Sequence, residues 1–138
     1  MALEKFINDL EKALDRLRDA YNKAVNFKET ENYEFFRDSV IQRFEFSVEI
    51  MWKSIKKFLE LREGITCRSP KSCVREFFSA GFISQQEAIN LLKMIDDRNR
   101  TSHTYHEEIA EEIFENIASY IPLMYKVLKI LKKNKGWL

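Results

Sequence analysis

A chain of 138 residues has the length of one ordinary domain, so we expect a single domain over residues 1–138. Hydrophobic residues make up 45% of the chain and charged residues 33%, which allows a packed core and excludes a disordered protein. The formal net charge of +1 excludes a strong overall attraction to nucleic acid, so phosphate binding would need a local basic patch. No apolar run approaches the length of a membrane span, and we expect a soluble protein without membrane contact.

The first two predicted helices are long. Apolar residues recur at steps of three and four from about residue 3 to 25, which is typical of an amphipathic helix. The polar interval NFKETEN separates this helix from a second one predicted over residues 33–63, and Gly64 is placed to end the second helix. The second helix has a wide apolar surface, so we expect it to lie centrally and to be buried on more than one side. Its aromatic residues are predicted to belong to the core or to a dimer surface: Phe35, Phe36, Phe44, Phe46 and Trp52.

Three further helices are predicted from their end signals. Ser69 followed by Pro70 indicates the start of a short helix that runs to about residue 80. The stretch from Ser84 to Glu87 fits a capping box that begins a fourth helix. The stretch from Thr104 to Glu107 fits a second capping box, which would begin the last helix. No alternating strand pattern is found, and the predicted fold is therefore an all-α, up-and-down bundle of four to five helices.

The two cysteines, Cys67 and Cys73, do not match a disulfide scaffold in a chain of this size, and their spacing fits no zinc pattern. We therefore expect reduced thiols, a cytoplasmic protein and no metal site.

The polar stretch RNRTSHTY at residues 98–105 lies between the fourth and fifth predicted helices, where side chains are released from packing. Arg98 and His103 are five residues apart, which is about 140° around an ideal helix. A break in the helix would let both side chains reach one place.

Such a pair suits chemistry on phosphate esters. A guanidinium group matches phosphate oxygens, and an imidazole can move protons near neutral pH. His103 could act as general base or acid at a ribose 2′-hydroxyl while Arg98 stabilises charge on the phosphorus, so RNA could be cleaved without a metal or cofactor. Two histidines from a symmetric dimer would serve this reaction better than one. On spacing alone, a polar joint between helices with no catalytic role remains the alternative, and the dipole of the preceding helix accounts for Arg98.

The residues Arg98-Asn99 and Ser102-His103-Thr104-Tyr105 resemble the Arg-x4-His-x-Tyr motif of the HEPN superfamily. The stretches IQRFEFSVEIMWKSIKKFLE, SPKSCVREFFSAGFI and DDRNRTSHTYHEE are similar to its nucleotidyltransferase substrate-binding, HepT-like branch, over roughly residues 3–131. His106 departs from the pattern of that branch, which usually has an acidic residue after the tyrosine.

The resemblance implies a HEPN-like helical homodimer that acts with a minimal nucleotidyltransferase encoded nearby. The first function it implies is that of a substrate-binding partner in a two-gene, toxin–antitoxin-like pair. The alternative is a metal-independent endoribonuclease toxin that the transferase silences by adding AMP to Tyr105. By this resemblance Arg98 and His103 are the candidate catalytic residues, and RNA or a nucleotide is the candidate ligand. Three residues are candidates for modification or nucleotide binding: Tyr105, Asn99 and Ser102.

Tyr105 and the acidic residues before the motif could each have a structural role instead of a functional one. Tyr105 could simply pack its ring against Leu92 or Ile109 in the first turn of the last helix. The pair Asp96 and Asp97 could orient His103 or coordinate magnesium, although acidic pairs are common on helix surfaces.

Overall fold

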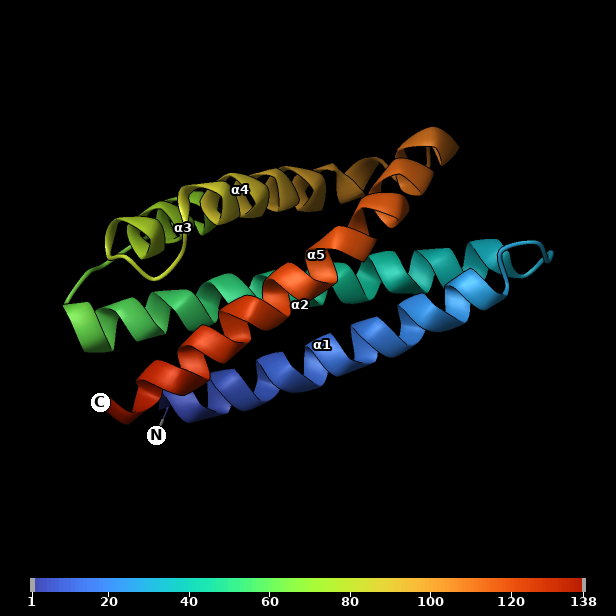
Figure 1. The fold of residues 1–138 in the computed structure, drawn as a ribbon. Helices are drawn as coiled ribbons and strands as arrows, with labels where there is room; N and C mark the ends of the chain where they lie inside the picture. The colour runs from blue at the N-terminus through green and yellow to red at the C-terminus, as the bar shows by residue number, and fades with distance from the viewer. Residues whose placement is uncertain (1, 138) are drawn as a thin grey trace.

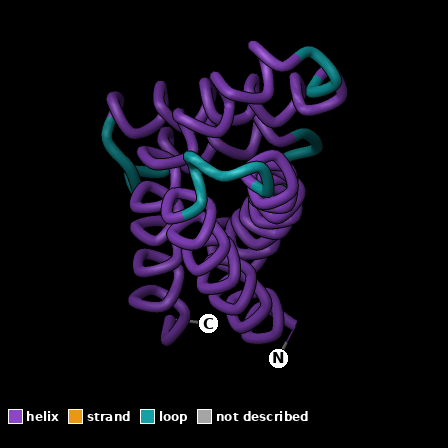
Figure 2. The backbone as a smooth tube through the Cα atoms, turned by 90° about the vertical axis from the view of Figure 1, so that its right-hand side faces the viewer, coloured by secondary structure: helices purple, strands orange, loops and turns teal. Residues whose placement is uncertain are grey.

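The computed structural model describes residues 2–137, and within them the backbone is helical with no β-strand. The elements in chain order are α1 (Ala2–Asn26), α2 (Tyr33–Glu63), α3 (Pro70–Ser79), α4 (Gln85–Arg100), the 3-10 helix η1 (Thr101–His103), α5 (Glu107–Asn134) and the 3-10 helix η2 (Lys135–Trp137). This confirms the all-α prediction with five α-helices. Short loops join the helices, which make up nearly all of the backbone (Figure 2).

The helix α2 is the centre of the bundle. It runs antiparallel beside α1, while α5 crosses this pair on one side and α3 and α4 lie along the other (Figure 1). All four other α-helices contact α2, as the wide apolar surface of residues 33–63 predicts. The two ends of the chain lie at the same end of the bundle (Figure 1).

The core is built from helical stripes of apolar residues. On α1 the buried residues follow the predicted spacing of three and four: Leu3, Ile7, Leu10, Leu14, Leu17 and Ala24. Each large apolar side chain removed from water in this way contributes roughly 1.5–3 kcal/mol. On α2, Phe44 is fully buried, whereas Phe35 and Phe46 are 78% and 57% exposed. The extra apolar surface of α2 is therefore covered only in part by the chain's own helices.

The predicted helix ends are largely confirmed. Gly64 ends α2 with a positive φ of 67°, a conformation that glycine adopts without the strain of a Cβ atom. Ser69 is the N-cap of α3, with Pro70 in its first turn, and Ser72 completes a capping box there that the sequence reading missed. The capping box of Ser84 and Glu87 at the start of α4 is present with both of its hydrogen bonds.

The predicted capping box at Thr104 is wrong. The chain continues from α4 into η1, and the Thr104 hydroxyl donates backward to the carbonyl oxygen of Thr101 at 3.1 Å. Thr104 keeps a helical backbone (φ −72°, ψ −3°), whereas an N-cap residue needs an extended one. His106 has that conformation and is the N-cap of α5, without a side-chain capping bond. The glutamate at position 107 binds Arg37 instead of reaching back to the cap.

The prediction of reduced cysteines is also wrong, because Cys67 and Cys73 form a disulfide. Cys67 lies in the loop before α3 and Cys73 in the first turn of that helix. The turn at Ser69 and Pro70 reverses the chain between them, so their Cα atoms come within 5.1 Å, inside the range that a disulfide requires. Counting residues between cysteines does not reveal this turn. The expectation of a cytoplasmic location was based on reduced thiols, so the disulfide removes its support.

Two further features concern the long helices. Among residues 2–137, no helix combines the length and apolar character needed to cross a bilayer. Pro122 lies inside α5, and the helix continues past it to Asn134.

Candidate functional site

The polar stretch at residues 98–105 begins in the last turn of α4, continues through η1 and forms the tight joint that leads to α5. Three of its hydroxyl groups donate to carbonyl oxygens three residues earlier: Thr101 to Arg98, Ser102 to Asn99, and Thr104 to Thr101. These bonds satisfy carbonyl groups that the end of a helix leaves without partners. These hydroxyl side chains therefore stabilise the backbone of the joint. The rings of His103 and Tyr105 are exposed to solvent.

The end of α4 is anchored on α5 through Asp97. Its carboxylate is buried and accepts hydrogen bonds from the Tyr120 hydroxyl at 2.6 Å, the Asn116 amide at 3.0 Å and the Arg100 guanidinium at 3.1 Å. Burial, together with the bond to Asp97, raises the pKa of Tyr120. Asp97 thus positions the residue that follows it, Arg98.

The acidic pair Asp96 and Asp97 lies just before the joint, and its two side chains have different surroundings. Among the described residues, no hydrogen bond or ion pair joins Asp97 to His103. The neighbouring Asp96 is exposed and pairs with Lys71 of α3. The two aspartates therefore serve different purposes, one as a buried anchor and one as a surface charge.

The start of α5 is anchored on α2 by an arginine that the sequence reading missed. Arg37 is 3% exposed, and its guanidinium donates to Glu107 at 2.7 Å and approaches Glu111 at 3.5 Å. The hydrogen bond from Arg37 lowers the pKa of Glu107. Tyr33, one turn earlier on α2, donates to Glu111 at 2.6 Å. Residues 98–106 are therefore held between two fixed helix ends.

Arg98 points from the last turn of α4 toward α2. Its guanidinium lies 3.9 Å from the carboxylate of Glu45, and about a third of each side chain is exposed. A pair at this distance and exposure is weak, so an incoming phosphate can compete for the guanidinium. Glu45 is 53 positions away in the sequence, and no local pattern could have identified it.

His103, Tyr105 and His106 lie together at the surface. The ring centroids of Tyr105 and His106 are 4.2 Å apart, and those of His103 and Tyr105 are 6.3 Å apart. Tyr105 is 75% exposed, so the alternative in which it packs against Leu92 or Ile109 is wrong. All three residues come from η1 and the turn that follows it, whose end is closed by a hydrogen bond from the His106 amide to the His103 carbonyl.

A shallow hollow of about 370 Å³ lies beside the joint, between α2 and Thr104. It is lined by Asp38, Ser39, Ile41, Gln42, Glu45, Phe46 and Thr104. Because Glu45 both lines this hollow and pairs with Arg98, the guanidinium of Arg98 lies at its edge. In the described residues no hydrogen bond, ion pair or ring contact joins Arg98 to His103. The structure therefore places the two candidate catalytic residues on one joint, with a hollow next to it, rather than in direct contact.

Comparisons with known proteins identify the family and the fold of the chain. Residues 5–133 match the family model described as nucleotidyltransferase substrate binding protein like. A crystal structure of a Thermus thermophilus protein is 36% identical, with a TM-score of 0.79 over 88% of this chain and 98% of that one. No protein with a curated description matches the sequence.

Two solved structures with lower identity share the fold. A Haemophilus influenzae protein, described as having the fold of a substrate binding domain of a nucleotidyltransferase, is 24% identical with a TM-score of 0.80 over 91% of this chain and 98% of that one. A tri-AMPylated Shewanella oneidensis HEPN toxin, in complex with its MNT antitoxin, is 16% identical with a TM-score of 0.68 over 96% of this chain and 97% of that one. The resemblance to nucleotidyltransferase substrate-binding proteins seen in the sequence is thus confirmed. The chain belongs to the nucleotidyltransferase substrate-binding protein family.

Proposed function

We propose that this protein is the partner of a minimal nucleotidyltransferase and offers Tyr105 as the acceptor of an AMP group. The observation that carries the proposal is the exposure of Tyr105, because it is the one exposed tyrosine among the five of the chain. The hydroxyls of three others donate to carboxylates: Tyr33 to Glu111, Tyr120 to Asp97 and Tyr125 to Asp15. The fifth, Tyr21, is half-buried and stacks on Phe114. The Tyr105 hydroxyl has no hydrogen-bond partner among the described residues.

The reaction needs only groups that the two proteins and ATP supply. The phenolic oxygen of Tyr105 attacks the α-phosphorus of ATP, a new P–O bond forms, the bond to the β-phosphate oxygen breaks, and pyrophosphate leaves. The phenolic proton passes to a base or to water. The AMP-bearing HEPN toxin among the structural relatives supports this chemistry for the fold.

The added phosphate must find positive charge close to the joint. The first turn of α5 carries Glu107 and Glu108, so carboxylates already compensate the helix dipole there. The groups available to an AMP phosphate are therefore Arg98, His103 and His106. Occupying Arg98 with this phosphate would deny the guanidinium to RNA, which is a local electrostatic switch.

Incubation with the neighbouring nucleotidyltransferase, ATP and magnesium is expected to raise the intact mass of the protein by whole AMP units. Tyr105→Phe should abolish the increase. Tyr125→Phe is the matched control and should be modified like the unaltered chain, because the Tyr125 hydroxyl is already bound to Asp15 at 2.5 Å. An unchanged mass with a transferase that is active on another acceptor would refute the proposal.

The second candidate function is metal-independent cleavage of RNA by Arg98 and His103. It is favoured by the exposed imidazole of His103 on the same joint as a weakly paired guanidinium. The 2′-hydroxyl of a ribose would lose its proton to His103 and attack the adjacent phosphorus, and the bond to the 5′-oxygen would break. Arg98 would stabilise the extra negative charge on the phosphorus. A second histidine, from another copy of the chain, would donate the proton to the leaving oxygen.

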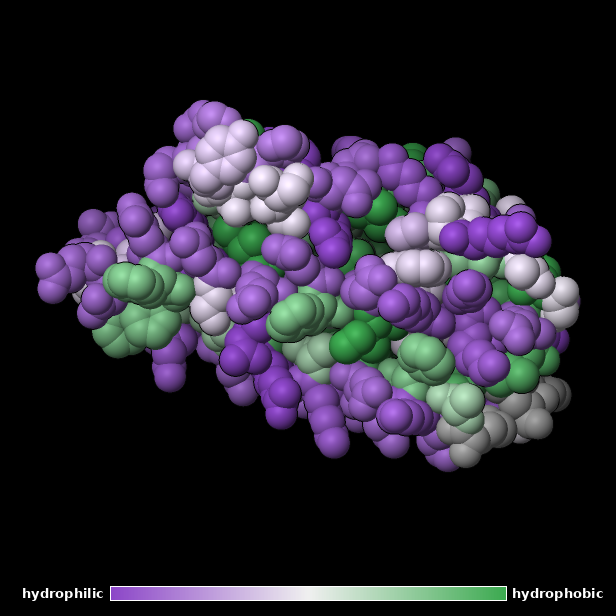
Figure 3. Space-filling model, turned by 180° about the vertical axis from the view of Figure 1, so that it is seen from behind, coloured by the Kyte–Doolittle hydropathy of each residue, from purple (hydrophilic) through white to green (hydrophobic). Residues whose placement is uncertain are grey.

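We propose a homodimer for this reason and because α2 has uncovered aromatic residues. Phe35 and Phe46 are eleven residues apart, about three helical turns, so they share one exposed face of α2. Phe46 also lines the hollow that holds Thr104. Apolar patches separated by hydrophilic side chains are visible on the molecular surface (Figure 3).

Sedimentation equilibrium at micromolar concentration is expected to give the mass of two chains. Phe46→Glu should shift the protein to the monomer, because it places a charge in the centre of the apolar contact. Phe78→Glu on α3, where the phenylalanine is 40% exposed, is the control and should leave the dimer intact. A monomer of the unaltered chain under these conditions would exclude the dimer.

A further inference from the structure

We propose that the groove between α1 and α2 binds the phosphate backbone of single-stranded RNA and leads it to the joint at residues 98–105. The groove consists of two adjoining hollows of about 390 and 280 Å³, which share Arg16 of α1 and Arg43 of α2. Cleavage of the bound strand rests on the proposed nuclease function. Binding of RNA to the groove does not, and it is measured separately from cleavage.

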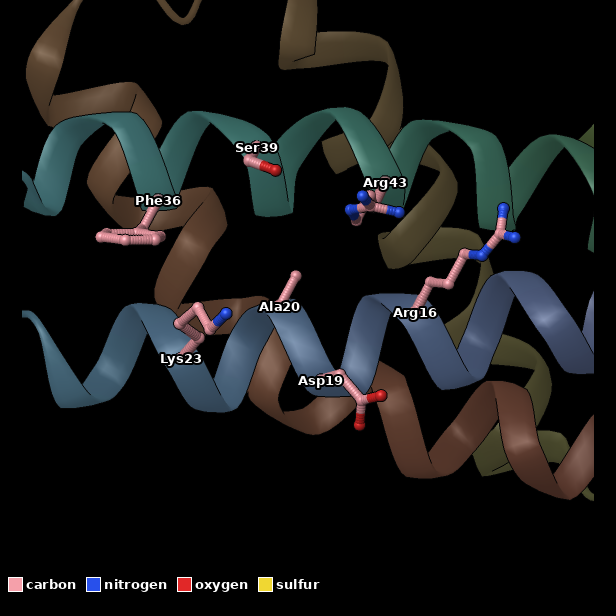
Figure 4. Close-up of a pocket in the computed structure, with 7 residues that line it drawn as sticks. All are labelled: Arg16, Asp19, Ala20, Lys23, Phe36, Ser39 and Arg43. Carbon is pink, nitrogen blue, oxygen red and sulfur yellow. The ribbon is translucent and has the colours of Figure 1, made fainter.

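The side chains in the groove are arranged to present cations. Figure 4 shows Arg16 extending from α1 toward α2, with Arg43 of α2 and Lys23 of α1 also directed into the space between the helices. The carboxylate of Asp19 points away from α2 in the same view. Asp19 has a cation of its own, Arg18, at 3.9 Å.

The groove carries more positive charge than the chain as a whole. Its charged lining residues are Lys12, Arg16, Lys23 and Arg43 against Asp9 and Asp19, which is four positive and two negative charges, or a net +2. The formal net charge of the entire chain is +1. The remaining residues therefore sum to −1 (+1 minus +2), and the groove is a local positive patch that attracts an anion.

None of the four cations is paired with a carboxylate within the described residues. Elsewhere in the molecule the arginines at positions 18, 37, 98 and 100 have carboxylate partners within 4.0 Å. A guanidinium without a carboxylate partner keeps its forked donors for phosphate oxygens, and no ion pair has to be broken on binding.

The length of the groove favours a strand over a single nucleotide. Lys12 and Lys23 are eleven residues apart, so they lie about 16 Å from each other along α1. This distance is several times the spacing of about 3.4 Å per nucleotide along one strand of a duplex, so the groove can contact more than one phosphate. Spaced cations that follow the phosphate backbone are a usual component of a single-strand site.

The groove is continuous with the candidate catalytic joint. Ser39 lines both the larger groove hollow and the hollow that contains Thr104, and Phe46 lines both the smaller groove hollow and that same hollow. A strand held by Arg16 and Arg43 can therefore cross α2 toward Thr104 and the rings of the joint.

The test measures binding of a fluorescently labelled, short single-stranded RNA by anisotropy, in a His103→Ala background that prevents cleavage. The double variant Arg16→Gln/Arg43→Gln is expected to lose at least about tenfold in affinity and to reduce the salt slope by about 1.4, which is about 0.7 for each lost phosphate contact on a single strand. Arg68→Gln/Arg75→Gln is the matched control, because it removes the same charge from two exposed arginines near α3. Circular dichroism verifies that both variants are folded.

Each outcome decides the inference. Equal RNA affinity of the groove variant and its parent would overturn it, as would an equal loss in the control or no RNA binding by the parent. Unchanged RNA affinity with lost binding of the nucleotidyltransferase would make the groove a protein-docking surface instead. If RNA binding depends on the groove and the unaltered chain cleaves no RNA, the inference stands and the nuclease function fails. If the unaltered chain cleaves RNA and the groove variant binds RNA normally, the nuclease function stands and the inference about the groove fails.

Discussion

Replacing His103 by alanine is expected to lower the rate of RNA cleavage by about 10²–10⁴-fold, the usual contribution of a general acid or base. The side chain is exposed on η1 and lies outside the core, so the loss should leave the helical circular dichroism unchanged. His106→Ala is the matched control. His106 is an exposed imidazole three residues later that caps α5 through its backbone only, and its replacement should cost far less activity.

Arg98 can be tested in the same assay. Arg98→Ala should lower cleavage by a comparable factor, and Arg98→Lys should recover only a part, because an ammonium group cannot make the forked contact with a phosphate. Chelators should have no effect on the rate. Full activity of His103→Ala would remove this residue from the mechanism. If the unaltered chain cleaves no RNA, the nuclease function is refuted, and only the proposed function as a nucleotidyltransferase partner modified at Tyr105 remains.

Replacing Asp97 by alanine is expected to lower the free energy of unfolding by about 3 kcal/mol. The substitution leaves the buried hydroxyl of Tyr120 and the amide of Asn116 without their acceptor, while Arg100 retains Glu112 at 2.9 Å. For a chain of this length the loss corresponds to a fall in Tm of roughly 10 °C. Chemical denaturation and a thermal scan of the two proteins measure the effect directly.

The adjacent aspartate provides the control for this experiment. Asp96→Ala removes an exposed carboxylate whose partner is a surface lysine, and it should change the free energy of unfolding by less than about 1 kcal/mol. Equal effects of the two substitutions would show that Asp97 does not anchor α4 on α5. A stable Asp97→Ala protein with lost cleavage would give Asp97 a role in the reaction rather than in folding.

Much of the secondary structure follows from the sequence, because helix signals are local. The periodic apolar residues of α1 and α2 predict the buried stripes, since one face of a helix must meet the core. Gly64 and the capping box of Ser84 and Glu87 mark helix ends through bonds or dihedral angles within a few residues. The motif at Arg98 and His103 is likewise readable in the sequence, but α4 runs past Arg98 to Arg100, so only His103 lies between the two helices, in η1.

The tertiary structure alone decided how those elements meet. The sequence pattern assigns Glu107 to a local capping box, but Arg37 from α2 binds it more favourably as a charge-assisted pair. The disulfide between Cys67 and Cys73 depends on a turn that brings their Cα atoms together, which residue counting does not describe.

The candidate site and the basic groove show the same division. Arg98 and Glu45 meet because α4 packs across α2, and Arg16 meets Arg43 because α1 lies beside α2. The sequence by itself indicated the candidate residues for the chemistry and the segment of the chain in which each one lies. Only the packing of the helices decided which of these residues share a surface, because such contacts join positions tens of residues apart and leave no local periodic signal.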